Sequence, residues 1–298
     1  MNIEPTGQIL GATITDLNLS EPLSKSDFAT LLRALAEHSV LRFPDQRLSA
    51  TALRDLAQRF GTLQTGVTGK AIEPGIPEVS ILSNIVRNGV PIGIPDAGQS
   101  WHTDMTYNRT PGYINALVAY EVPVRDGVTL GSTEFTNTAA AYDDLSDELK
   151  SSLADSTALH DLNLYWEYMR REKGSSRAAL TEEERKKRPP ARHPVFLTHP
   201  VSGRKIIFVN PGYCVAVEGM PPGEGERMMQ TLLDHVLQPK YRYRHHWEVN
   251  DMLIWDHLGT WHTAIADYGP NESRLMKRCQ VLADRIFDPD FVRDALAA

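Results

Sequence analysis

The sequence predicts a mainly β fold, a barrel or sandwich of strands with helices packed around it. Short segments rich in β-branched and aromatic residues dominate the middle and the end of the chain. Helical periodicity is confined to residues 24–60 and to two later inserts. The strands therefore do not alternate regularly with helices, as they do in proteins built on a parallel α/β sheet.

Length and composition fit one acidic domain. The chain has 298 residues, of which 41% are hydrophobic, and its net charge is -7. Single β domains often reach this length, so we expect one domain over residues 1–298. A negative surface repels nucleic acid and anionic lipid, which argues against both as partners. An anionic ligand would have to be bound by a local cluster of basic residues.

The N-terminal part, residues 24–60, is expected to hold two helices with a strand between them. Apolar residues recur at helical spacing over 24–37 and again over 49–60. Gly61 suits the position just after the end of the second helix. The intervening strand is expected at 39–43, where a proline follows it.

Residues 64–100 are expected to form a long loop. They are rich in glycine and proline and show little periodicity, apart from a short strand candidate at 79–82. Long loops inside a compact domain are often lids, and this one leads directly into His102. A lid-like loop is therefore one interpretation, and a disordered surface excursion is the alternative.

Strands and two helical inserts are expected after the loop. The inserts cover about 138–187 and about 224–237. In the second insert Met228, Leu232, Leu233 and Val236 are expected to face inward. The expected strands are 113–120, 128–135, 195–198, 205–209, 251–255 and 274–283.

His102 and Asp104, with His262 far downstream, are candidate metal ligands. Residues two apart on a strand project to the same face, so His102 and Asp104 could reach one ion. His262 follows a buried-looking strand and is expected on the turn beyond it. Two imidazoles and one carboxylate with open positions are the ligand set of non-haem iron oxygenases.

Other histidines compete for these roles. His246-Trp247-Glu248 offers the same ligand types at the same spacing, but it lies in a run that alternates polar and apolar residues, as on an exposed strand. The remaining candidates for the third ligand lie in turn-like regions before prolines or in expected helices; they are His193, His199, His160 and His235. From the residues alone, His262 stays one candidate among these.

Arg274 and Arg278 lie four residues apart on an expected strand, so they share one face. Two arginines on the inner face of a barrel could bind two carboxylates through paired hydrogen bonds. The alternative is an outer-face strand, where the arginines would meet solvent or surface acids.

Taken together, these segments resemble the taurine dioxygenase and 2,4-dichlorophenoxyacetate dioxygenase (TauD/TfdA) family of Fe(II)/2-oxoglutarate-dependent oxygenases. The similar stretches occur in the family's order over most of the chain, before Arg274 and Arg278. They are Trp101–Thr106 (WHTDMT), Gly131–Phe135 (GSTEF), His193–Lys205 (HPVFLTHPVSGRK) and Trp255–His262 (WDHLGTWH).

The resemblance implies a double-stranded β-helix (a jelly roll, cupin-like) core and a single catalytic domain. It implies that His102, Asp104 and His262 bind Fe(II). Thr133 and Arg274 would hold the distal carboxylate of 2-oxoglutarate, and Arg278 would face the acidic group of the substrate. The implied reaction consumes O₂ and 2-oxoglutarate and hydroxylates the substrate, which in some cases cleaves it.

The expected substrate is a small organic acid, either an aryloxyalkanoate or related aromatic carboxylate, or an alkylsulfonate. A sulfate ester or a phosphonate is the alternative within the same chemistry. A metal-binding β-barrel without catalysis and a zinc hydrolase are the rival classes. No signal peptide or membrane-spanning segment is visible and the two cysteines form no pattern, so we expect a cytoplasmic homo-oligomer.

Overall fold

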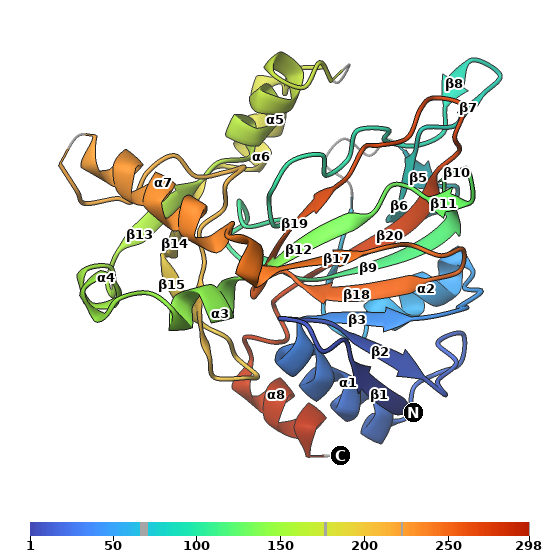
Figure 1. Cartoon of the computed structure of the whole chain (residues 1–298), viewed down its shortest axis with the longest axis horizontal. Helices are drawn as coiled ribbons and strands as arrows, with labels where there is room; N and C mark the ends of the chain where they lie inside the picture. Colours follow the sequence, from blue (N-terminus) through green and yellow to red (C-terminus); the bar gives the residue numbers. More distant parts are fainter. Residues whose placement is uncertain (66–70, 176–177, 222, 298) are drawn as a thin grey trace.

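The computed structural model describes residues 1–65, 71–175, 178–221 and 223–297. In this part of the chain a main sheet has nine strands, and most of its neighbours are far apart in sequence (Figure 1). Its order is β1 (Asn2–Pro5), β2 (Ala12–Thr15), β3 (Val40–Phe43), β18 (Met252–Asp256), β9 (Gly112–Glu121), β20 (Leu275–Leu282), β6 (Ile76–Ser83) and β5 (Ile72–Glu73), with β4 (Leu63–Gln64) also on β20.

A smaller sheet faces the main one. Its order is β17 (Arg242–His245), β12 (Thr133–Asn137) and β19 (Thr260–Ala264), all antiparallel. Phe135 and Tyr243 from this sheet pack with Leu117, Trp255 and Met276 from the main sheet in one buried cluster. The predicted mainly β fold is thus confirmed as two sheets around a shared core.

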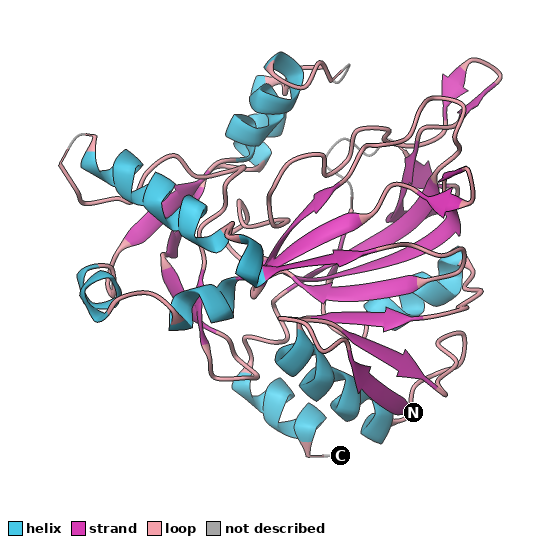
Figure 2. Cartoon of the chain, in the orientation of Figure 1, coloured by secondary structure: helices cyan, strands magenta, loops and turns pink. Residues whose placement is uncertain are grey.

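Helices cover the outer face of the main sheet. These are α1 (Lys25–His38), α2 (Ala50–Ala57) and α8 (Pro289–Leu296), and Figure 2 shows them apart from the remaining helices. Leu31, Leu32 and Leu53 are fully buried in the cluster between these helices and the strands. On β20, Cys279 and Val281 face this cluster while Met276 faces the inter-sheet core, as the two-residue period requires.

The remaining helices and two strand pairs form a second group, which lies at one end of the small sheet (Figure 1). The helices are α3 (Thr138–Asp143), α4 (Asp147–Ser152), α5 (Leu162–Arg171), α6 (Glu182–Lys187) and α7 (Glu224–Val236), with the short 3-10 helix Pro239–Tyr241. The strand pairs are β13 (Thr157–His160) with β14 (Ala191–Pro194), and β15 (Phe196–Thr198) with β16 (Lys205–Ile207). No helix in the described ranges has the length and apolar character needed to cross a bilayer.

The prediction of one lid-like loop over 64–100 is wrong for much of that segment. Residues 76–83 form β6, an eight-residue strand paired with β20 inside the main sheet. A small hairpin follows, made of β7 (Val86–Arg87) and β8 (Val90–Pro91). Glycines and prolines in this segment interrupt the chain between short strands. Residues 66–70 lie outside the described part of the chain.

Two further segments differ from the sequence prediction. The strand expected at 128–135 is split by Gly131, whose φ of 72° turns the chain. Val128–Thr129 forms β11, paired with β10 (Val124–Arg125), and β12 begins at Thr133. The helical insert expected at 138–187 contains the helices α3, α4, α5 and α6, but it also contains β13, a strand that pairs with residues beyond the insert.

Gly61 does not cap α2. The helix ends at Ala57, and Gly61 instead packs against β20, where an added Cβ would lie 2.4 Å from the carbonyl oxygen of Leu282. In α7 the predicted inward residues Leu232 and Val236 are buried, and Met228 and Leu233 are partly buried against the same cluster, which Met229 also joins.

Candidate active site

Backbone pairing places His102 beside His262. The two residues form an antiparallel bridge in which the amide of His102 donates to the carbonyl of His262 over 3.0 Å, and the reverse bond is 2.7 Å. Their rings consequently lie 4.3 Å apart between centroids. His262 is therefore inside strand β19, and the expectation that it lies on a turn is wrong.

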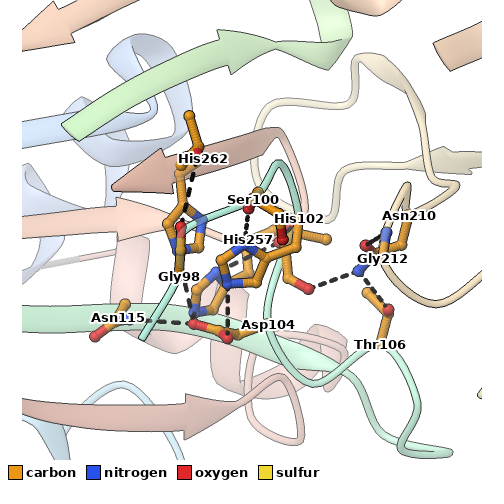
Figure 3. Close-up of polar contacts among 12 residues, drawn as sticks. Gly98, Ser100, His102, Asp104, Thr106, Asn115, Asn210, Gly212, His257 and His262 are labelled. Carbon is orange, nitrogen blue, oxygen red and sulfur yellow. Dashed lines mark hydrogen bonds and ion pairs between the residues drawn. The ribbon is translucent and has the colours of Figure 1, made fainter. Parts of the chain in front are cut away.

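Asp104 completes the group of three predicted ligands. One ligand atom from each of His102, Asp104 and His262 lies within 4.8 Å of the others, and all three residues are buried (Figure 3). The Nε2 atoms of the two histidines lie 3.5 Å and 3.9 Å from oxygens of Asp104. Asp104 reaches them from a turn after the bridge and not from a regular strand. The prediction that His102 and Asp104 project from the same face of a strand is therefore wrong.

The hydrogen bonds of this group suit a cation. Nδ1 of His102 lies 2.7 Å from the carbonyl oxygen of Ser100, and this oxygen only accepts, so the ring proton is on Nδ1. In the neutral ring the lone pair of Nε2 then faces the Asp104 carboxylate with no hydrogen between them. Electron pairs that converge in a buried space fit a bound metal ion.

Local charges favour the ligand forms of these side chains. Burial opposes ionisation of Asp104, but Arg278, His102 and His257 outweigh it and hold its pKa well below the usual range. Burial holds the pKa of His262 well below its ordinary value. Near neutral pH the site therefore presents a carboxylate and a neutral imidazole, the forms that bind metals.

Two residues that the sequence analysis missed support Asp104. Nδ2 of Asn115, from β9, lies 3.3 Å from its Oδ2, and Nε2 of His257 lies 3.7 Å from the same oxygen (Figure 3). Burial lowers the pKa of His257 to about 4, so the ring is neutral. Asn115 could have been found, because it is a polar residue in the middle of the apolar run Tyr113–Tyr120.

Thr133 lies in β12, opposite Ala264 of the strand that carries His262, and Arg274 directly precedes β20, with its Nε beside Gly131. Arg274 is 6% exposed, and its Nε has no partner among the described residues. Burial lowers its pKa, and the ring of Tyr268 lies 5.9 Å from its guanidinium carbon. A buried guanidinium with a free donor needs an anion, which fits the carboxylate of 2-oxoglutarate.

The hydroxyl of Thr133 is oriented by Trp247, whose indole Nε1 donates to it over 3.0 Å. Since Thr133 accepts this bond, its own hydroxyl hydrogen is left to donate to a ligand. Trp247 belongs to the competing His246–Glu248 triplet. There His246 and Glu248 are exposed, and Glu248 pairs with Arg42, so this triplet is not a metal site.

Arg278 points to the same centre from β20. Its Nη1 lies 3.4 Å from Oδ2 of Asp104, and its Nε is buried without a partner among the described residues. The inner-face interpretation of the two arginines is therefore confirmed. Arg278 is beside the three candidate ligands, and it keeps donors for a second anion.

Two of the other histidines have partners elsewhere, whereas neither ring nitrogen of buried His160 has a hydrogen-bond partner among the described residues. His193 donates from Nε2 to the carbonyls of Thr106 and Asn108, and Nε2 of His199 lies 3.3 Å from Oδ2 of Asp256. Both roles are structural, as the resemblance implied. His160 lies in β13, so the prediction that it lies in a helix is wrong.

Tyrosines from the helical insert and the neighbouring loops line one side of the centre. The ring of Tyr165, from α5, stacks on His102 at 5.5 Å between centroids. Tyr213 lies edge-on to both Tyr165 and Tyr107, at 5.4 Å and 5.2 Å. The helical period of α5 marked only its apolar face, so this wall could not be predicted without the tertiary contacts.

Comparison with known proteins gives close relatives over the whole chain. The chain is 30% identical to the alpha-ketoglutarate-dependent 2,4-dichlorophenoxyacetate dioxygenase of Cupriavidus pinatubonensis over 297 residues, which covers 95% of this chain and 98% of the relative. It is 29% identical to the pentalenolactone F synthase of Streptomyces arenae, with 95% and 96% covered.

Among solved structures, AAD-2 in complex with Mn(II) and N-oxalylglycine superposes with a TM-score of 0.77 at 26% identity, covering 94% of this chain and 98% of that one. This likeness confirms the jelly-roll core. The model of the family described as "Taurine catabolism dioxygenase TauD, TfdA family" matches residues 2–280. The chain therefore belongs to the TauD, TfdA family and is a 2-oxoglutarate-dependent dioxygenase that uses Fe(II) and O₂.

Proposed function

We propose that this chain hydroxylates a small organic acid of the aryloxyalkanoate or aromatic carboxylate class. The observation that carries the proposal is the position of Arg278, 3.4 Å from Asp104 within the group of three candidate ligands. A cationic side chain at that place would hold an acidic substrate beside the reacting metal.

His102, Asp104 and His262 would hold the iron. With iron bound, O₂ would be the oxidant and 2-oxoglutarate would supply two electrons, so that one oxygen atom enters a C–H bond of the substrate as a hydroxyl group and the other enters succinate, with release of CO₂. The protein keeps the Asp104 carboxylate ionised and the His262 ring neutral, as the pKa shifts indicate. The bond from Nδ1 of His102 to Ser100 orients the remaining ligand.

Thr133 and Arg274 would bind the distal carboxylate of 2-oxoglutarate. Arg274 contributes a buried guanidinium and Thr133 a hydroxyl oriented by Trp247. Because Arg274 is buried away from water, a carboxylate bound there would interact with its guanidinium group more strongly than it would in water. Arg278 is left for the acid group of the substrate.

The tyrosine wall favours an aromatic or apolar substrate body. Tyr107, Tyr165 and Tyr213 are buried and contact one another edge to face, next to His102. Aromatic rings bind well against such edges, and the wall excludes water from the reacting centre. The relative named for 2,4-dichlorophenoxyacetate acts on a compound of this kind.

A succinate-release screen tests the proposal. The protein would be incubated with Fe(II), ascorbate and 2-oxoglutarate, and with aryloxyalkanoates, aromatic carboxylates, alkylsulfonates, sulfate esters or phosphonates. The expected result is substrate-dependent succinate with an aryloxyalkanoate or an aromatic carboxylate. Turnover restricted to sulfonates, sulfate esters or phosphonates would contradict the proposed substrate class and leave the reaction class intact.

A further inference from the structure

A basic pocket lies beside the tyrosine wall, and its lining includes the residues that connect α6 to β14. Its volume is about 510 Å³, and Tyr107, Arg109 and Arg188 are among the residues that line it. No aspartate or glutamate belongs to its described lining. In a chain with a net charge of -7, such a local cluster of positive charge needs a physical reason.

Two of the cations in this pocket lack a close ion-pair partner among the described residues. Arg192 pairs with Glu218 and Lys187 pairs with Glu183, so these two are engaged. By contrast, Arg109 and Arg188 form no ion pair within 4.0 Å with an acid in the described ranges, although the charge of Arg188 helps to lower the pKa of Glu184, one helical turn before it. Two such guanidinium groups beside one hollow are suited to a carboxylate, sulfonate or phosphate group.

Tyr107 connects this pocket to the active site. It is 6% exposed and lines the pocket, and its hydroxyl makes no hydrogen bond to a described residue. Burial, together with the charge of Asp104, raises its pKa to about 12, against the opposing charges of Arg188 and Arg278. Tyr107 therefore lies close enough to interact with charged groups of both the active site and the pocket.

The walls of the pocket are held in place. His193 cross-links them, because it lies in β14 and donates to the carbonyls of Thr106 and Asn108 over 2.8 Å and 3.0 Å. Pro189 and Pro190 stiffen the segment that leads into β14. A fixed pocket loses little entropy when a ligand binds, which favours a binding role over an incidental surface hollow.

We propose that this pocket binds a second anionic group of the substrate, at the end opposite to the acid that Arg278 faces. The inference rests on the proposed function, since it assigns the far end of the same substrate. It narrows the substrate class to acids with two anionic groups separated by an apolar or aromatic body. Arg109 and Arg188 would bind the outer group, and the hydroxyl of Tyr107 would donate a hydrogen bond to it.

Calorimetry with matched acids tests this proposal. The protein would be loaded with Mn(II) and N-oxalylglycine and titrated with phenoxyacetate and with 4-carboxyphenoxyacetate, and in parallel with heptanoate and pimelate. We expect the second carboxylate to tighten binding about tenfold in at least one pair, and to do so less at high salt. In Arg188→Gln and Arg109→Gln the ratio of the two dissociation constants should fall towards one.

Lys186→Gln is the matched control, because Lys186 is a nearby cation on α6 that pairs with Glu182 outside the pocket lining. This variant should keep the full ratio. Three results would each overturn the proposal. They are equal affinity for both acids of each pair, a gain in affinity from the second carboxylate that survives in both arginine variants, and no binding of any of the four acids. If only the pocket assignment is wrong, the monoacids phenoxyacetate and heptanoate still bind. If the proposed function is wrong, no aryloxyalkanoate or aromatic carboxylate in the screen releases succinate.

Discussion

The side chain of Asn115 donates a hydrogen bond to the Asp104 carboxylate over 3.3 Å, from the middle of a strand that is otherwise apolar. The oxygen that accepts it, Oδ2, also lies near Arg278 and His257. Asn115 thus fixes the orientation of one candidate iron ligand, although it lies eleven residues further along the chain.

Replacing Asn115 by Leu should weaken metal binding about 10- to 100-fold, as is usual when a hydrogen bond to a ligand is lost. Titration with Mn(II) or Co(II), followed by electron paramagnetic resonance or absorption, measures the change. Thr136→Val is the control, since it removes a buried hydrogen bond to Val236 in the small sheet. Unchanged metal affinity in the Asn115 variant would refute the positioning role.

Arg274 and Arg278 should separate in kinetics. Arg274→Ala removes the buried guanidinium near Thr133 and should raise the KM for 2-oxoglutarate, by about tenfold or more. Arg278→Ala should raise the KM for the organic acid more than that for 2-oxoglutarate. Succinate release measured against each substrate gives both constants. Equal effects of Arg278→Ala on the two would mean that this residue does not discriminate between the two anions.

His160 makes stability depend on pH. Burial and the charge of His193 lower the pKa of His160 to about 3 from an ordinary value of 6.5. Between these values the unfolded chain binds a proton that the folded chain does not, so stability falls as pH falls from 6.5 towards 3. From pH 7 to pH 5 the loss should be about 2 kcal/mol for this group.

His160→Phe removes the titrating group but keeps a ring against Phe208, whose centroid lies 6.0 Å away. The free energy of unfolding in urea, measured at pH 7 and pH 5, should therefore fall less in the variant than in the natural chain. The same fall in both proteins would show that His160 is not the source.

Gly61 is required by close packing. An added Cβ would lie 2.4 Å from the carbonyl oxygen of Leu282 and 2.7 Å from Oδ1 of Asp284. Gly61→Ala should therefore lower the free energy of unfolding by about 1–3 kcal/mol, because the main chain of β20 has to move. Gly75→Ala is an imperfect control for space, since its surroundings are open but its φ is 78°. Unchanged unfolding of Gly61→Ala would show that β20 yields without cost.

The sequence predicted what depends on local pattern and on motifs. The mainly β class, α1, α2 and the strands β9, β18 and β20 lie where the periodicity placed them. Arg274 and Arg278 both face inward, as the two-residue period of a strand predicts for residues four apart. Family motifs identified His102, Asp104 and His262 as a group, which the residues alone could not do.

The rest depends on contacts between distant segments. The bridge of His102 with His262 joins residues 160 positions apart, and β6 is a strand because β20 pairs with it. Asn115 and His257 act on Asp104 only through this packing. The pocket at Arg188 and the tyrosine wall arise where the insert meets the turn after Asp104, and no local pattern encodes that meeting.

The most direct test of the central claim is the visible absorption of the anaerobic protein with Fe(II) and 2-oxoglutarate. The natural chain should show a charge-transfer band, and His102→Ala, Asp104→Ala and His262→Ala should lose it while melting at nearly the same temperature. His246→Ala, which changes the exposed histidine of the competing triplet, should keep the band. A band that persists in any of the three ligand variants, or that is absent from the natural chain, would contradict the account.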